Sequence, residues 1–200
     1  MDLLVVALTF GSIFVVELPD KTFIATLVMS TRMRPLFVWV GVGLAFLAQT
    51  AVAVALGKAA SLLPETPVQV AAMLMFLVGA VLLLRESRTA DAEEADQERE
   101  YAERAGTAHG LKVVATSFVV LFAAEWGDLS QLLTISLVAK YDAPLEVFLG
   151  AWGALLAVSG LAVLVGRALL ARVRLAVLHR VGAGVCLLMA ALTAYELLRG

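Results

Sequence analysis

Two acidic tetrads stand inside long hydrophobic stretches of this sequence, E-L-P-D at residues 17–20 and E-W-G-D at residues 125–128. An ionised side chain near the centre of a membrane costs roughly 2.5–3.5 kcal/mol on insertion scales. Side-chain packing alone does not require that cost. The spacing therefore indicates a site near the membrane midplane that binds a cation, or protons exchanged for one.

The four acids of the tetrads are suited to a hard divalent cation. Mg²⁺ and Mn²⁺ take oxygen ligands in near-octahedral geometry, and Ca²⁺ takes more oxygens in looser geometry. Residues three apart share a helix face, so Glu17 and Asp20 are expected to point together, as are Glu125 and Asp128. Close carboxylates repel one another when all are ionised, so protons could replace a departing ion.

Four neighbouring residues are candidates for further contacts in this metal site. Thr22 and Ser130 follow the acids at equivalent places, and Gln131 could offer an amide oxygen. Lys21 lies four residues after Glu17 and could pair with it on one helix face. Hydroxyls in membrane helices also bond the carbonyl one turn earlier, so both roles stay open for Thr22 and Ser130.

The elements that must position these residues are predicted to be membrane-spanning helices. Hydrophobic residues make up 62% of the chain and the mean hydropathy is +0.94, whereas soluble domains are about 45–50% apolar. Six stretches are long enough to cross a bilayer, and prolines stand in the polar breaks between several of them. They run over residues 3–30, 36–56, 68–84, 112–139, 145–165 and 175–198.

The two halves of the chain resemble each other. Glu17 and Asp20 recur as Glu125 and Asp128 at an offset of 108 residues. Each half holds three predicted helices, an odd number, so the second copy must enter the membrane from the opposite side. We therefore predict an all-α membrane protein of six transmembrane helices arranged as two inverted three-helix repeats, with the site at their interface. The expected divisions are residues 1–86, an acidic linker 87–110, and residues 111–200.

The polar stretch between the halves predicts the orientation. It has helix-forming composition but no apolar stripe wide enough for a core, so a solvated, partly disordered linker is expected. Most of the 15 Lys and Arg residues fall on the side of the membrane that carries this linker. The positive-inside rule then places the linker in the cytoplasm and both termini outside.

With their flanking residues, E-L-P-D-K-T at 17–22 and E-W-G-D-L-S-Q at 125–131 resemble paired E-x-G-D-[KR]-[ST] signatures. These signatures belong to the small calcium/manganese:proton antiporters, which include Golgi manganese and calcium transporters and bacterial manganese exporters. The resemblance covers nearly the whole chain, and it implies that the four acids bind the ion. Two residues depart from the pattern: Pro19 stands where the family has glycine, and Leu129 where a Lys or Arg is usual.

Between the acids, Pro19 and Gly127 occupy matching positions. Proline removes a backbone donor and kinks a helix, whereas glycine allows a helix to unwind. Both residues are therefore expected to interrupt their helices and to turn backbone carbonyls toward the cavity.

The resulting hypothesis is a secondary transporter, not an enzyme, that exchanges a divalent cation for protons. Mn²⁺ is the leading substrate and Ca²⁺ stays open. The expected partners are the metal ion and the lipid bilayer, without nucleic acid or a prosthetic group, and a homodimer is kept open. The resemblance implies a multi-pass protein of the bacterial inner membrane that exports its ion.

Three alternatives stay open. The tetrads could be structural kinks whose carboxylates bond neighbouring helices. The same acids could serve as counter-ions in an exporter of small organic cations such as amino acids. An intramembrane aspartyl protease would also place two acids between helices, with Gly127-Asp128 as a faint echo of its motif. That enzyme would need neither the two glutamates nor the repeat.

Overall fold

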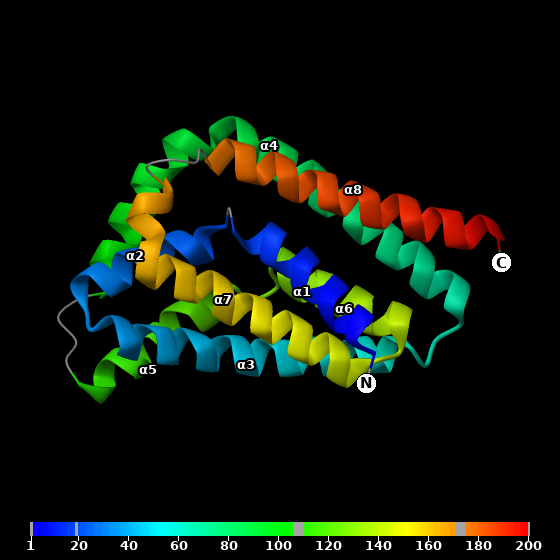
Figure 1. The fold of residues 1–200 in the computed structure, drawn as a ribbon, viewed down its shortest axis with the longest axis horizontal. Coiled ribbons are helices and arrows are strands. Elements are labelled where there is room, and N and C mark those ends of the chain that lie inside the picture. Colours follow the sequence, from blue (N-terminus) through cyan, green and yellow to red (C-terminus); the bar gives the residue numbers. More distant parts are fainter. Residues whose placement is uncertain (1, 19, 106–109, 171–174, 200) are drawn as a thin grey trace.

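The computed structural model describes residues 2–18, 20–105, 110–170 and 175–199, and all the regular elements in these ranges are α-helices. The predicted all-α class is therefore confirmed. The first half forms α1 (Leu3–Glu17), α2 (Lys21–Arg32), α3 (Pro35–Ala60) and α4 (Glu65–Ala105) (Figure 1). The second half forms α5 (Leu111–Ala124), α6 (Leu129–Tyr141), α7 (Pro144–Leu170) and α8 (Leu175–Arg199).

Two of the predicted spans are each broken into a bent pair of helices. The axes of α1 and α2 meet at 71°, and those of α5 and α6 meet at 73°. Both breaks coincide with the acidic tetrads, so the two acids of each pair do not share a helix face as expected, although their side chains do point together. Gly127 has a φ of +79°, which L side chains rarely adopt, so the expected helix interruption is confirmed there. Pro19 lies outside the described residues.

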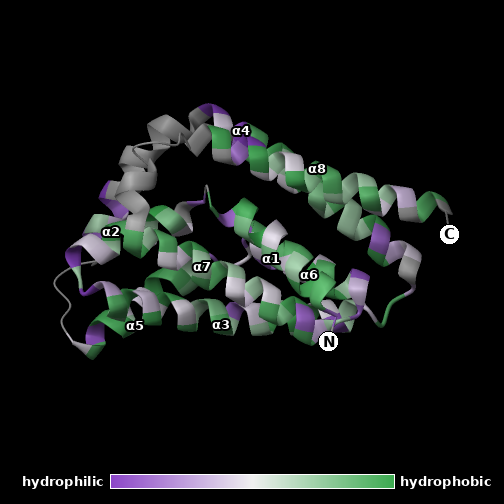
Figure 2. Cartoon of the chain, viewed as in Figure 1, coloured by the Kyte–Doolittle hydropathy of each residue, from purple (hydrophilic) through white to green (hydrophobic). Residues whose placement is uncertain are grey.

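Apolar residues run along most of the helices (Figure 2). Within the described part of the chain, α3, residues 66–88 of α4 and residues 144–164 of α7 are long and apolar enough to cross a membrane. Each bent pair adds one more candidate span if it is counted as a unit, which gives five. In α8, the apolar stretch His179–Tyr195 is shorter. The chain is a multi-pass membrane protein, and the sixth span stays a prediction.

Helix α4 continues well beyond membrane length into the acidic stretch. It reaches Ala105, so the prediction of partial disorder is wrong for this part of the linker. Ala, Glu and Arg dominate the segment, and these residues favour the helical state. Tyr101, near the end of the helix, is only 4% exposed and belongs to the hydrophobic core. The end of α4 is thus packed against the rest of the protein.

The two halves interlock through equivalent contacts. Helix α1 packs on α7, α5 packs on α3, and α4 lies along α8 (Figure 1). On α3, a Cβ added to Gly41 would lie 2.9 Å from the Cβ of Ser117; on α7, a Cβ added to Gly150 would lie 2.8 Å from the Cβ of Thr9. Gly41 and Gly150 are 109 residues apart, and Thr9 and Ser117 are 108 apart. The close approaches are therefore the same contact made once from each half.

Candidate metal centre

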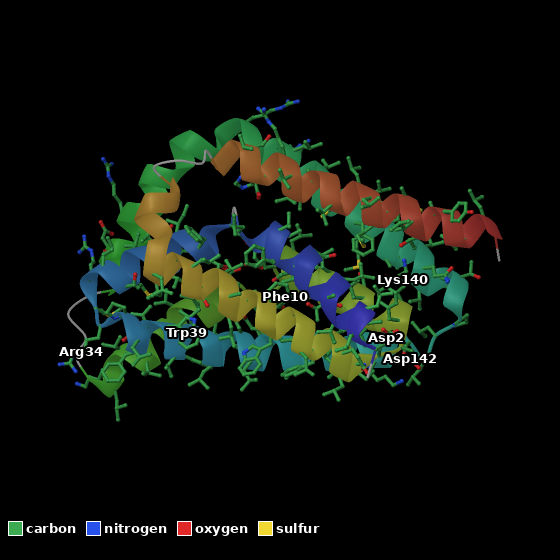
Figure 3. All side chains as sticks on the ribbon, in the orientation of Figure 1. Asp2, Phe10, Arg34, Trp39, Lys140 and Asp142 are labelled. Atoms are coloured by element: carbon green, nitrogen blue, oxygen red, sulfur yellow. The ribbon has the colours of Figure 1, made fainter. Side chains whose placement is uncertain are left out.

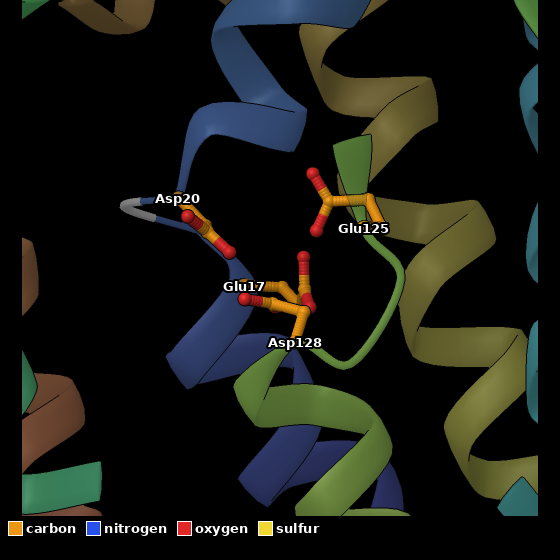
Figure 4. Close-up of side chains that lie close together, drawn as sticks. All are labelled: Glu17, Asp20, Glu125 and Asp128. Atoms are coloured by element: carbon orange, nitrogen blue, oxygen red, sulfur yellow. The ribbon is translucent and has the colours of Figure 1, made fainter. Parts of the chain in front are cut away.

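The two helix breaks bring four carboxylates together inside the molecule (Figure 4). One carboxylate oxygen from each of Glu17, Asp20, Glu125 and Asp128 lies within 4.8 Å of the other three. Oxygens bound at about 2.0–2.6 Å from a common ion are at most about 4–5 Å apart. The four side chains are therefore close enough to hold a single divalent cation once small side-chain movements draw the oxygens in.

Burial differs within each pair of acids. Glu17 is 1% exposed and Glu125 is 2% exposed, whereas Asp20 and Asp128 are partly exposed. Ionised carboxylates so close together repel one another, and burial removes the water that would screen them. A divalent cation or added protons would relieve this repulsion. The side chain of Lys21, predicted to pair with Glu17, lies outside the described part.

A tight backbone turn, not a helix face, keeps the acids of each tetrad together. The amide of Asp20 donates to the carbonyl of Glu17 at 3.1 Å, and the amide of Asp128 donates to that of Glu125 at 3.2 Å. Asp128 is the N-cap of α6, yet its side chain makes no capping hydrogen bond. Its carboxylate is directed at the other acids instead.

The helix ends at the breaks also contribute to the electrostatics. Helices α1 and α5 end at the tetrads, and α2 and α6 begin just after them. Carbonyl groups at a helix C-terminus carry partial negative charge, whereas the N-terminus of a helix favours nearby carboxylates. Both effects suit a site in which carboxylates hold a cation.

Gln131, a predicted candidate ligand, forms hydrogen bonds with the backbone of the break between α5 and α6. Its Oε1 accepts a hydrogen bond from the amide of Gly127 at 3.1 Å, and its Nε2 donates to the carbonyl of Glu125 at 3.0 Å. The amide oxygen that could have faced the ion is thus used by the backbone. The side chain encloses the turn that carries Glu125 and Asp128.

Gln49 of α3 is a second carboxamide at this break, and the sequence reasoning missed it. Its Nε2 donates to the carbonyl of Phe122, in the last turn of α5, at 3.0 Å. The residue is 3% exposed. The signal in the sequence was an amide inside an otherwise apolar stretch, since polar residues within membrane helices are costly and mark functional sites.

The hydroxyls near the acids behave differently in the two halves. Thr22 and Thr26 are fully buried, and their Oγ1 atoms make no hydrogen bond within the described part of the chain. In the second half, Thr134 Oγ1 donates to the carbonyl of Ser130 at 2.7 Å, one turn earlier on the same helix. Thr22 thus has a hydroxyl available for a ligand, and Ser130 lies buried beside the acids.

A separate polar cluster lies at the end of the molecule that carries the N-terminus (Figure 3). Lys58, at the end of α3, places its Nζ 2.6 Å from Oδ1 of Asp142, which also accepts from Ser61 Oγ at 3.1 Å. The bond from Lys58 holds the pKa of Asp142 below its ordinary value of 3.8. The cluster fastens the turn between α6 and α7 to α3 through the neutral pH range.

Comparisons with known proteins identify the family. A family model described as the divalent cation/proton antiporter GDT1 matches residues 5–91 and 113–200. The GDT1-like protein sll0615 of Synechocystis is 34% identical over 66% of this chain and 68% of its own length. A putative manganese exporter of Vibrio cholerae is 30% identical over 96% of this chain and 90% of its own length.

The chloroplastic GDT1-like protein 1 of rice is also 30% identical over 96% of this chain, which spans 62% of the length of that relative. No solved structure matches the chain. The matched family consists of transporters whose substrates are divalent cations and protons, so the predicted transporter class is confirmed against an enzyme. The chain belongs to the GDT1 family of divalent cation/proton antiporters.

Proposed function

We propose that this chain is a secondary transporter that exchanges Mn²⁺ for protons, and that Glu17, Asp20, Glu125 and Asp128 bind the ion. The observation that carries the proposal is the cluster of four carboxylate oxygens within 4.8 Å of one another, supplied equally by the two breaks. Such a set of hard oxygen ligands suits a divalent cation.

Two considerations favour Mn²⁺ over Ca²⁺. The similarity to a putative manganese exporter extends over 90% of the length of that relative. In addition, four carboxylate oxygens with two hydroxyl or water oxygens would make a six-ligand set, which suits Mn²⁺. Ca²⁺ takes six to eight oxygens in a looser arrangement and is the second ion to test.

In this proposal the carboxylates carry either the ion or protons across the membrane. When Mn²⁺ leaves, protonation removes the repulsion between the empty acids, and the protonated site returns. An inward proton gradient across a bacterial inner membrane would then drive export. Thr22 and Ser130 are the nearest candidates for additional oxygen ligands.

The arrangement that we propose for this exchange is two inverted repeats of three spans each, residues 1–86 and 111–200. The matched contacts of Gly41 with α5 and of Gly150 with α1 support it, because each half makes the same contact with the other. The acidic segment 87–110 would lie in the cytoplasm with both termini outside, as the distribution of Lys and Arg favours. A site at the interface of such repeats suits alternating access.

The decisive experiment measures Mn²⁺ and Ca²⁺ flux into proteoliposomes with an imposed pH gradient. We expect gradient-driven Mn²⁺ flux in the wild type and loss of at least about 100-fold in Glu17→Gln and Asp128→Asn, since each variant removes one ligand. Glu103→Gln, an exposed acid of α4, is the matched control and should transport normally. The proposal would be contradicted if the wild type transported neither ion. It would also be contradicted if amino acids, and not Mn²⁺, competed for transport.

A further inference from the structure

At the break between α5 and α6 (the second break), the side-chain amides of Gln49 and Gln131 form hydrogen bonds with the backbone. These two carboxamides have no counterpart at the break between α1 and α2 (the first break). Gln131 corresponds to Phe23 at an offset of 108 residues, and Gln49 corresponds to Val158 at an offset of 109. Phe23 and Val158 are both fully buried and pack together in a small apolar cluster with Leu27 and Ala162. Equivalent places beside the acids are thus polar in one half and apolar in the other.

The bonds of Gln131 fix the conformation of the turn. A helix that stops inside a protein leaves backbone groups that need hydrogen-bond partners. Gln131 supplies a donor to the carbonyl of Glu125 and an acceptor to the amide of Gly127. Both bonds fall between the two acids, so they set the distance and direction from Glu125 to Asp128.

The bond of Gln49 fixes the position of the same turn relative to the bundle. The carbonyl of Phe122 lies in the last turn of α5, where the helix no longer provides all its partners. Gln49 reaches it from α3, the helix against which α5 packs closely at Gly41. The hydrogen bond from Gln49 therefore holds the C-terminal end of α5 against α3.

We propose that Gln49 and Gln131 are positioning residues for transport, which hold the second break in the shape that directs Glu125 and Asp128 at the acids of the first break. The proposal rests on the proposed function of the four acids. It means that the second break is a preformed half of the metal site, fixed by hydrogen bonds. At the equivalent places in the first half, Phe23 and Val158 pack together in an apolar cluster instead.

The test is Mn²⁺ transport by reconstituted Gln49→Met and Gln131→Met, which preserve side-chain length and remove the hydrogen bonds. We expect the KM for Mn²⁺ to rise about five- to tenfold in each, the loss of affinity that one or two neutral hydrogen bonds produce, while the maximal rate stays within about twofold. Hydrogen exchange at the backbone of residues 123–129 should become faster in Gln131→Met.

A matched control separates this role from a general loss of stability. Trp152→Phe removes a hydrogen bond of 3.1 Å between Trp152 Nε1 and the carbonyl of Gly43, which also joins two helices and involves neither tetrad. This variant should keep a wild-type KM and wild-type exchange at residues 123–129.

The outcomes are distinguishable from failure of the proposed function. Wild-type flux in Glu17→Gln would overturn the function itself. The positioning role alone would be overturned by two results together. Glu17→Gln would lose flux, and Gln131→Met would show the same KM for Mn²⁺ and the same hydrogen exchange as Trp152→Phe. Should Gln49→Met not give folded protein, Gln131→Met, whose bonds are local to the break, decides the question.

Discussion

At the break between α5 and α6, two carboxamides bond the backbone, whereas at the break between α1 and α2 the equivalent side chains are phenylalanine and valine. The acids are nevertheless the same in both halves, and in each half the amide of the aspartate donates to the carbonyl of the glutamate. Hydrogen bonds and apolar packing can each hold a short turn, so the support can differ as long as four carboxylates converge. The chemistry of the site thus constrains the acids more strictly than it constrains their surroundings.

The difference between the halves continues along α2 and α6. Thr134 bonds the carbonyl one turn earlier, whereas the equivalent Thr26 makes no hydrogen bond within the described part of the chain. The first half therefore carries a buried hydroxyl that is available to water or a ligand. Variants at equivalent positions can test how far the two halves differ in function.

The largest effect is expected at the acids, where the halves should be equal. Glu17→Gln and Glu125→Gln should each reduce Mn²⁺ flux by at least about 100-fold, because each removes a buried ligand. Asp20→Asn and Asp128→Asn should also match each other. Flux in proteoliposomes at a fixed pH gradient measures all four. Tolerance of substitution in one half alone would show that the ion is held by a single break.

The apolar pattern of the sequence predicted the helices well because membrane helices need long apolar stretches regardless of their neighbours. Hydropathy did not predict the breaks, since a four-residue interruption scarcely changes the average over a span. The absence of an apolar stripe likewise gives no sign that α4 continues to Ala105. The helix propensity of the segment and the burial of Tyr101 favour the helix there.

At the candidate site, the sequence predicted that the four acids would lie together but gave the wrong local geometry. The i,i+3 spacing that suits one helix face also suits the tight turn in which Asp128 bonds the carbonyl of Glu125. Only the positive φ of Gly127 distinguishes the two, and glycine is common in both settings. The role of Gln49 depends on which helix packs on α5, and no local pattern contains that information.

A smaller effect is expected at the glycine contacts that join the halves. Gly41→Ala and Gly150→Ala should each destabilise the protein by about 1–3 kcal/mol, because the added methyl group has no room against the facing helix. Thermal unfolding in detergent measures this, and Tm should fall by about 2–10 °C. Gly184→Ala, with no atom within 4 Å of the added Cβ, is the control. A clear difference between Gly41→Ala and Gly150→Ala would show that the two interfaces are not equivalent.

The smallest effect is expected at the threonines of α2 and α6, where the halves should differ in sign. Thr134→Val should lower stability by about 1 kcal/mol, since it removes the hydrogen bond to Ser130. Thr26→Val should raise stability by up to about 1 kcal/mol, because it replaces a buried hydroxyl that has no hydrogen bond in the described part of the chain. Thermal unfolding of both variants, without metal and with saturating Mn²⁺, measures the difference.

The measurement with Mn²⁺ decides what the Thr26 hydroxyl does. If Thr26 lies outside the ion's reach, Mn²⁺ stabilises the wild type and Thr26→Val equally, and the flux of the variant stays within about twofold of the wild type. A smaller stabilisation of Thr26→Val by the ion would instead place this hydroxyl among the ligands. Stabilisation by a ligand grows with its affinity for the folded state, so the loss would report the contact directly. The first break would then hold the ion through one more oxygen than the second. The half that has Phe23 and Val158 in place of the two carboxamides would thus supply more ligands.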